Sequence, residues 1–486
     1  MTAPGRSRAR WSPLAAVLAA AFAGCAATEP ALPHRPPEPV DLPNGFGTPT
    51  AAGHVAVDWW LAFAAPGLDA AVRQGLEHNR DLRAAVARLD AARAQAVVAG
   101  GAAWPTLEAG ADAARRRQNF PGLPLPGGND LHTTYSTFGV DLTASWEIDL
   151  WGRVRAGVDA ASAEFAASAV DLRAAQLSLA AQIARAWFAR LEARLQLELA
   201  ERSQASWAAS AEAVQGRFAA GVRPALDVHL VATGRHAAQA QVAFRREQHE
   251  RAVRQLELLL GRYPSGAIGQ EPAALPVVGA PPPAGLPATL LRQRPDLVAA
   301  EFRALAQDRR VAAATAALYP RLVLSASVGT NAATADRVLD PDFLVWSLLG
   351  GVTAPLFRGG ALRAEVDLQQ AQLQAACATW GAAVLRACGE VEIALAAGAR
   401  LAERAAGLEL AHTAAQAAFA AASTRYRAGL ENVVTLLEAQ RRADETESQW
   451  LAARHACVDA RITLFVALGG GFDLDAKTPE PTGEPR

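Results

Sequence analysis

The feature that most constrains this chain of 486 residues is an internal duplication. Three short motifs occur twice, the first two at an offset of 215 in residue number and the third at an offset of 208. They are Asp81-Leu82 with Asp296-Leu297, Trp104-Pro105 with Tyr319-Pro320, and Arg217-Phe218-Ala219-Ala220-Gly221 with Arg425-Tyr426-Arg427-Ala428-Gly429. Solenoid repeats have periods of about 20–50 residues, so this period is far too long for one. The chain is therefore expected to fold as two similar halves.

Each half is predicted to open with one helix, over residues 66–103 and 287–318, and to contain a very long helical hairpin after its strands. Residues 153–218 and 361–426 are proline-free, alanine-rich runs of 66 residues each, which corresponds to about 100 Å of helix at 1.5 Å per residue. A second helix returns after each run, so the predicted hairpins span 152–262 and 361–468. Helices of this length without caps favour coiled-coil packing. A rigid spacer rod is the alternative, but it does not account for the strands described next.

Two segments in each half alternate between apolar and polar residues. We predict strands at about 106–118 and 134–148, and at about 321–330 and 343–356. These lengths suit tilted transmembrane strands, which need about 9–11 residues. Four strands cannot close a barrel, and an open edge is not tolerated in lipid, so several protomers would have to share one barrel. A soluble four-stranded sheet with one wet face is the alternative.

Composition excludes several kinds of function. Lys477 is the only lysine, which excludes a Walker-type phosphate loop, a Schiff-base lysine and a Ser-x-x-Lys acyl-enzyme. The 47 Lys and Arg residues balance 48 Asp and Glu residues, so no basic surface for nucleic acid is indicated. The sequence contains no His-Glu-x-x-His, Gly-x-Ser-x-Gly or Cys-x-x-Cys motif. We therefore expect no catalytic residue, no metal and no cofactor.

The N-terminus is predicted to be a signal peptide over residues 1–24. Its n-region carries three arginines, and an apolar stretch follows over residues 14–23. The segment Phe22-Ala23-Gly24-Cys25 resembles a bacterial lipobox, in which the cysteine receives covalent lipid, including palmitate. Buried acyl chains stabilise membrane binding by about 0.8 kcal/mol per methylene group. An ordinary signal peptide cut nearby, with Cys25 incidental, is the alternative.

Five motifs along the chain occur in the order of one known family. They are Asp58-Trp59-Trp60, Asn79-x-Asp81-Leu82, Trp146-Glu147-Ile148-Asp149-Leu150-Trp151-Gly152-Arg153, Pro355-Leu356-Phe357-Arg358-Gly359-Gly360 and Arg425-Tyr426-Arg427-Ala428-Gly429. With this set the chain resembles the outer-membrane factor (TolC/OprM-like) family, the exit ducts of tripartite efflux pumps, in its lipoprotein (NodT-type) branch. The resemblance implies a membrane β-barrel above a long α-helical coiled-coil barrel. Four transmembrane strands per protomer would close as a 12-stranded barrel in a homotrimer.

The resemblance also implies a passive function and its partners. An inner-membrane pump and a periplasmic adaptor would deliver drugs or other toxic solutes to the duct. Contact with the adaptor is expected at the hairpin tips, through Arg217, Phe218, Gly221, Arg425, Tyr426 and Gly429. Val434 and Glu438 would form the periplasmic constriction, with Arg441 nearby.

The expected constriction has a consequence for charge. Three symmetry-related Glu438 carboxylates would repel one another, which would raise the pKa of the set. Leu226 and Leu230 occupy the positions equivalent to Val434 and Glu438, so only the second half would supply charge. A surface ion pair between Glu438 and Arg441, at i and i+3 on one helix, is the alternative for this acid. Glu147 and Asp149 are expected to line the lumen where barrel meets tunnel.

The predicted organisation covers the whole chain. It consists of the signal peptide 1–24, a lipidated extended segment 25–57, a first repeat 58–270, a Pro-rich linker 271–286, a second repeat 287–470 and a tail 471–486. The protein is placed in the cell outer membrane of a Gram-negative bacterium, with the tunnel projecting into the periplasm. Two alternatives stay open, a lipid-anchored periplasmic coiled-coil adaptor and a type I secretion exit duct.

Overall fold

The structure is a computed structural model, which describes residues 41–47, 53, 55–120, 131–267 and 274–472. The chain divides into two units, residues 1–36 and residues 37–486, and every element below belongs to the second. The predicted signal peptide, Cys25, the loop 121–130 and nearly all of the tail lie outside the described residues.

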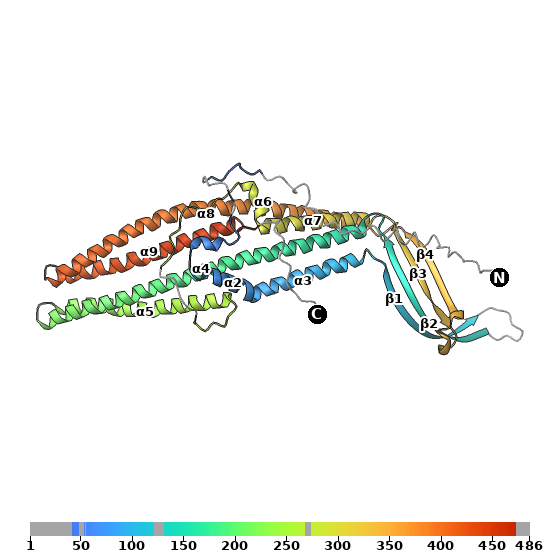
Figure 1. The fold of residues 1–486 in the computed structure, drawn as a ribbon, viewed down its shortest axis with the longest axis horizontal. Helices are drawn as coiled ribbons and strands as arrows, with labels where there is room; N and C mark the ends of the chain where they lie inside the picture. Colours follow the sequence, from blue (N-terminus) through green and yellow to red (C-terminus); the bar gives the residue numbers. More distant parts are fainter. Residues whose placement is uncertain (1–40, 48–52, 54, 121–130, 268–273, 473–486) are drawn as a thin grey trace, which may run out of the picture. The chain divides into compact units, whose positions relative to one another are not determined.

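The two halves of the chain contain matching elements (Figure 1). The first half has η1 (Trp59–Phe63), α2 (Leu68–His78), α3 (Arg80–Gly101), β1 (Thr106–Phe120), β2 (Leu131–Ile148), α4 (Arg153–Ala219) and α5 (Ala225–Leu259). The second half has η2 (Pro287–Thr289), α6 (Leu290–Gln293), α7 (Pro295–Ala316), β3 (Arg321–Ala332), η3 (Ala335–Arg337), η4 (Pro341–Phe343), β4 (Leu344–Thr353), α8 (Ala361–Arg427) and α9 (Val433–Ala467). The long helices match in length, since α4 and α8 have 67 residues each and α5 and α9 have 35 each.

The opening helix expected in each half is divided in the structure. In the first half, Asn79 leaves the helical conformation between α2 and α3 and caps α3, because its Oδ1 accepts hydrogen bonds from the N–H groups of Asp81 (2.9 Å) and Leu82 (3.0 Å). In the second half, the division falls at Arg294. Pro295 follows it at the first position of α7, and a residue before proline is disfavoured in the helical conformation.

The four strands form one antiparallel sheet in the order β1-β2-β3-β4, as the alternating pattern predicts. Apolar residues oppose one another across it, for example Leu142 with Val328 and Leu322 with Val352. The last strand ends at Thr353, not at residue 356 as predicted. The reason is that Thr353 opposes Arg321, the first residue of β3, so the residues after it have no partner in the chain.

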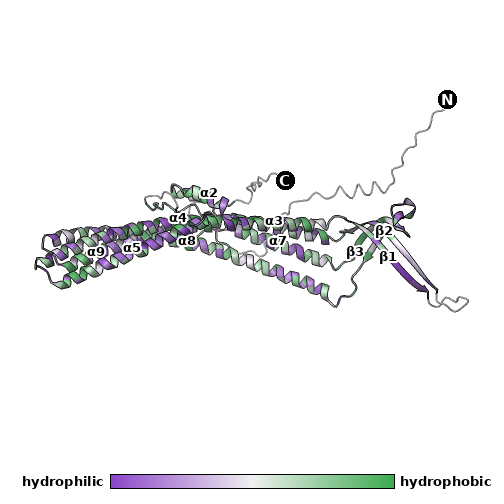
Figure 2. Cartoon of the chain, turned by 90° about the horizontal axis from the view of Figure 1, so that it is seen from below, coloured by the Kyte–Doolittle hydropathy of each residue, from purple (hydrophilic) through white to green (hydrophobic). Residues whose placement is uncertain are grey.

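The principal core lies where η1 and α2 pack on α4 and the end of α9. Aromatic rings meet there, with the ring centroids of Trp59 and Phe465 at 5.3 Å and those of Phe63 and Phe188 at 5.2 Å. Away from this core, hydrophilic and hydrophobic residues are mixed along both hairpins (Figure 2). Of the helices in the described ranges, none carries an apolar stretch long enough to cross a bilayer.

Candidate functional site at the hairpin tips

Both hairpins reverse through the same backbone turn. At the end of α4, the N–H of Gly221 donates to the carbonyl of Phe218 and the N–H of Val222 donates to the carbonyl of Arg217, both at 2.9 Å. Gly221 has a φ of +69°, a left-handed conformation that favours glycine. Gly429 repeats the arrangement in the second half with a φ of +76°. These two glycines are therefore needed to stop and reverse the helices.

The two tips contact each other through Arg217 and Tyr426. The guanidinium carbon of Arg217 lies 4.4 Å from the centroid of the Tyr426 ring, and its Nη2 donates to the carbonyl of Arg427 at 2.9 Å. Arg223, on the same tip, donates to the carbonyl of Glu431 at 3.2 Å. The first hairpin thus holds the second one at its end, through two arginines and one ring.

Tyr426 is buried inside the chain rather than placed on its surface. Only 1% of the residue is exposed, and it packs in a cluster of apolar residues from all four long helices. The buried members of this cluster are Val214, Val231, Tyr426, Val433 and Leu436. The Tyr426 hydroxyl has no hydrogen-bond partner in the described part of the chain. Its ring is therefore unavailable for direct contact with another protein, although the resemblance placed it at the adaptor contact.

Several apolar residues at the two hairpin tips are exposed. We call them the tip patch, which consists of Phe218, Val222, Leu226, Leu430 and Val434. Val222 and Leu430 occupy equivalent positions of the two halves and are 69% and 68% exposed. Neither residue is among those predicted from the sequence, although both directly follow the repeated glycine.

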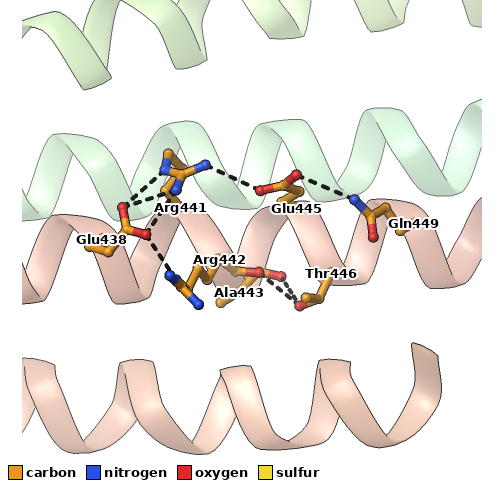
Figure 3. Close-up of polar contacts among 7 residues, drawn as sticks. All are labelled: Glu438, Arg441, Arg442, Ala443, Glu445, Thr446 and Gln449. Carbon is orange, nitrogen blue, oxygen red and sulfur yellow. Dashed lines mark hydrogen bonds and ion pairs between the residues drawn. The ribbon is translucent and has the colours of Figure 1, made fainter. Parts of the chain in front are cut away.

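Glu438 lies on α9 one helical turn after Val434 and is held by two arginines (Figure 3). Its carboxylate accepts hydrogen bonds from Arg441 Nη2 and Arg442 Nε, both at 2.8 Å, while Arg441 Nη1 also reaches Glu445 at 3.2 Å. Hydrogen bonds from Arg441, and then from Arg442, lower the pKa of Glu438. The pKa is lowered because the charges nearest to Glu438 within one chain are guanidinium groups, whereas the expected rise concerns repulsion between carboxylates of different copies.

A second acid, Glu431, stabilises the second tip. Its carboxylate accepts hydrogen bonds from the N–H of Asn432 and from Arg425 Nε, both at 3.3 Å, and these bonds lower its pKa. Asn432 in turn caps α9, since its Oδ1 accepts from the N–H of Thr435 at 2.8 Å. Arg425 is therefore engaged within its own turn. Glu431 is not among the residues predicted from the sequence.

A line of polar contacts joins α4 to α9 above the tips, and we call it the polar seam. Arg202 Nη2 donates to Glu447 and Ser203 Oγ donates to Asp444, both at 2.6 Å, and farther toward the tips Gln440 bonds with Ser210 at 3.1 Å. Burial raises the pKa of Asp444. The seam shows that the two hairpins are held together by hydrogen bonds as well as by apolar packing.

The junction between sheet and helices is built by the Trp146–Arg153 motif. Glu147 pairs with Arg153 at 2.7 Å, and Asp149 accepts hydrogen bonds from the N–H groups of Val154 (3.0 Å) and Arg155 (2.8 Å) at the start of α4. Burial acts to raise the pKa of Asp149, but these backbone bonds and the Arg155 side chain lower it overall. The two acids thus form an ion pair and a helix cap in the chain, where the sequence analysis expected lumen-lining groups.

Comparison with known proteins assigns the family. The sequence profile described as "Outer membrane efflux protein" matches residues 71–262 and 286–470. The chain belongs to this family. Over 446 residues it is 32% identical to the pyoverdine export outer membrane protein OpmQ of Pseudomonas putida, covering 90% of this chain and 93% of that protein. Over 419 residues it is 32% identical to outer membrane protein OprJ of Pseudomonas aeruginosa, covering 86% and 87%.

Solved structures of efflux channels share the fold. The outer-membrane channel OprN superposes with a TM-score of 0.81 at 29% identity, covering 89% of this chain and 98% of that chain. The open state of the MtrE channel of Neisseria gonorrhoeae gives 0.79 at 28% identity, covering 92% and 100%. These matches confirm the predicted family, the fold of long helices with four antiparallel strands, the outer-membrane location and a channel in place of an enzyme. Among the described residues, no group of His, Cys, Asp and Glu side chains could hold a metal ion.

Proposed function

We propose that the chain is the channel subunit of a tripartite efflux system, which conducts small molecules passively from a periplasmic adaptor and an inner-membrane pump to the outside. The observation that carries the proposal is the pair of long hairpins, each with the same turn, joined to a sheet with two open edges. In a member of the outer membrane efflux protein family, this combination supports a tunnel continuous with a pore. A related protein from Pseudomonas putida, 32% identical, is the toluene efflux pump outer membrane protein TtgI.

The open edges of β1 and β4 support a homotrimer. One chain supplies four strands, whereas transmembrane barrels begin at about eight strands. Three copies would supply twelve strands, and closing the ring would remove every open edge. Covalent lipid on Cys25, outside the described residues, would add an anchor in the outer membrane.

The tip patch is the proposed docking surface for the adaptor. Its apolar side chains are exposed on both tips, and an exposed apolar patch rimmed by charge is typical of a protein contact site. Arg217, Arg425, Gly221, Gly429 and the buried Tyr426 would act by fixing the shape of this surface. Phe218 is the one predicted contact residue that also belongs to the patch.

Val434, Glu438 and Arg441 are the proposed constriction. Val434 and Glu438 lie one turn apart on α9 with their side chains substantially exposed. Because each Glu438 binds Arg441 and Arg442, a ring of three would combine acidic and basic charge. Removing the carboxylate would leave the guanidinium groups in excess.

Single-channel conductance in a planar bilayer tests both parts of this proposal, the channel and the constriction. We expect wild-type protein to form channels and Glu438→Ala to shift their ion selectivity toward anions. Glu403→Ala is the matched control, because Glu403 is also exposed and paired at i,i+3 spacing with an arginine, Arg400, on α8. If the ion selectivity of the channels is unchanged in Glu438→Ala, the assignment of Glu438 to the constriction is wrong. If the protein is monomeric, water-soluble and forms no channels, the channel proposal is wrong and a periplasmic adaptor is favoured.

A further inference from the structure

We propose that Arg115 and Arg117 bind the phosphate groups of lipid A in the outer leaflet of the outer membrane. Both arginines lie on β1, toward the end of the β1–β2 hairpin that is farthest from α3 and α4. This inference rests on the proposed function, since it takes the helical tunnel to point into the periplasm. The far end of the hairpin then lies at the outer leaflet.

The apolar face of the β1–β2 hairpin identifies the part that lies in lipid. Along this face β2 carries an unbroken apolar series, which consists of Phe138, Val140, Leu142, Ala144, Trp146 and Ile148. The residues of β1 that oppose the first four of them are Ala113, Ala111, Ala109 and Leu107. From Phe138 to Ile148 the strand covers about 33 Å. At a tilt of about 40° this length spans about 25 Å, the height of the apolar band of transmembrane barrels.

The two arginines directly follow the end of this apolar face. Ala113 and Phe138 form its last apolar pair. Because every second residue of a strand lies on the same face, the next pairs on this face are Arg115–Ser136 and Arg117–Thr134. The far part of β1 is accordingly hydrophilic (Figure 2). An arginine on the lipid face of a barrel is destabilising at the bilayer midplane but is tolerated near the interface. These positions therefore match the height of the lipid headgroups.

The two pairs offer donors that suit phosphate. A guanidinium group can bind a phosphate through two parallel hydrogen bonds, and the hydroxyl-bearing Ser136 and Thr134 lie directly opposite, with Cβ atoms of opposed residues about 4.5–5.5 Å apart. Arg115 and Arg117 are exposed, and neither side chain has a hydrogen-bond or ion-pair partner within the described ranges. Arg337, in the loop before β4, is instead paired with an aspartate. An anion would therefore neutralise two adjacent unpaired charges.

The apolar face beside the arginines favours a lipid as the source of the phosphate. Lipid A carries phosphate groups on a sugar headgroup, with acyl chains below it. Its chains can pack against Phe138 and Ala113 while its phosphates reach the arginines, as anionic headgroups do at basic clusters that border a membrane. A free phosphate ion gains nothing from this apolar face. Arg116 lies on the opposite face, where it opposes Tyr135, so it provides a matched control.

Binding of lipid A to the full-length protein in dodecylmaltoside micelles tests the proposal, with native mass spectrometry of the trimer as the readout. We expect Arg115→Gln and Arg117→Gln each to weaken binding by about tenfold, because a hydrogen bond to a charged group contributes at least that factor. Arg116→Gln should bind like wild type. Lipid A stripped of its phosphates should bind wild type no better than lipid A binds either arginine variant.

Four results would overturn the lipid site. They are wild-type binding of lipid A by both Arg115→Gln and Arg117→Gln, an equal loss of binding in Arg116→Gln, equal affinity of wild type for inorganic phosphate, and loss of the trimer in the two variants, which would place the arginines between copies. Conductance of the wild type in a planar bilayer is recorded in parallel. If channels form, each of these results leaves the channel proposal intact. Wild-type protein that is water-soluble and forms no channels would overturn both proposals.

Discussion

Truncating the buried ring of Tyr426 should loosen both hairpin tips. The ring is 1% exposed, packs in the apolar cluster of the tips, and is covered by Arg217 at 4.4 Å. Truncating a buried aromatic residue to alanine costs about 3–5 kcal/mol, and losing the cation–π contact adds about 0.5–2 kcal/mol. Tyr426→Phe should cost almost nothing, because the hydroxyl has no hydrogen-bond partner in the described residues.

Amide hydrogen exchange at the tips is the assay, because it reports the free energy of local opening. A loss of about 3 kcal/mol corresponds to exchange faster by about a hundredfold, since about 1.4 kcal/mol is a factor of ten. We expect this acceleration in Tyr426→Ala over residues 214–222 and 423–436. Leu410→Ala, at an exposed position of the same helix, should leave the tips unchanged. The reasoning fails if Tyr426→Ala exchanges like wild type, or if Tyr426→Phe exchanges as fast as Tyr426→Ala.

Further substitutions should change the stability of the protein in opposite directions, which thermal unfolding can measure. Gly234→Ala would place a methyl group 2.0 Å from the Trp207 ring. The overpacking cost of about 1–3 kcal/mol should outweigh the gain in helix propensity of about 1 kcal/mol, so this variant should be less stable. In Gly407→Ala the methyl group enters open space, so this variant should be more stable than wild type. Asp149→Asn should destabilise at pH 7, because the lowered pKa of Asp149 stabilises the fold above its ordinary value of 3.8. That deficit should close as the pH falls below this value, and a deficit unchanged at pH 3 would contradict the capping role. Asp444→Asn should be at least as stable as wild type at pH 7, because the raised pKa of Asp444 makes its ionisation unfavourable to folding; a clear loss of stability there would show that the seam needs the charge.

The sequence predicted most of the fold because its signals are local. Alternation of apolar and polar residues, which is clear in β2 and weak in β4, indicated the four strands, and long proline-free runs indicated α4 and α8. The division of each opening helix had local signals too, namely the capping Asn79 and the Arg294-Pro295 step. The end of β4 could not be read locally, since the pattern continues to residue 356 and only the position of Arg321 decides where pairing stops.

The site was less predictable because its contacts are long-range. Tyr426 lies in the last turn of α8, next to a hairpin turn that is expected at the surface. It is buried by contacts with the other half of the chain, including Arg217. The pairs of the polar seam likewise join residues that are far apart in sequence. Helical spacing predicts the pairing of Glu438 with Arg441 at i,i+3, and Arg442 at i,i+4 has the same spacing signal.

The register of the sheet also sets an order of folding. The two hairpins β1–β2 and β3–β4 join residues that are close in sequence, so each can form early. Joining them requires Ile148 to meet Leu322 in the second half, after the whole first half has been exported. In a single copy, the edges of β1 and β4 present unpaired backbone groups, which are templates for incorrect pairing. The closure proposed for the trimer would therefore compete with aggregation, and it should prevail more often at low rates of synthesis.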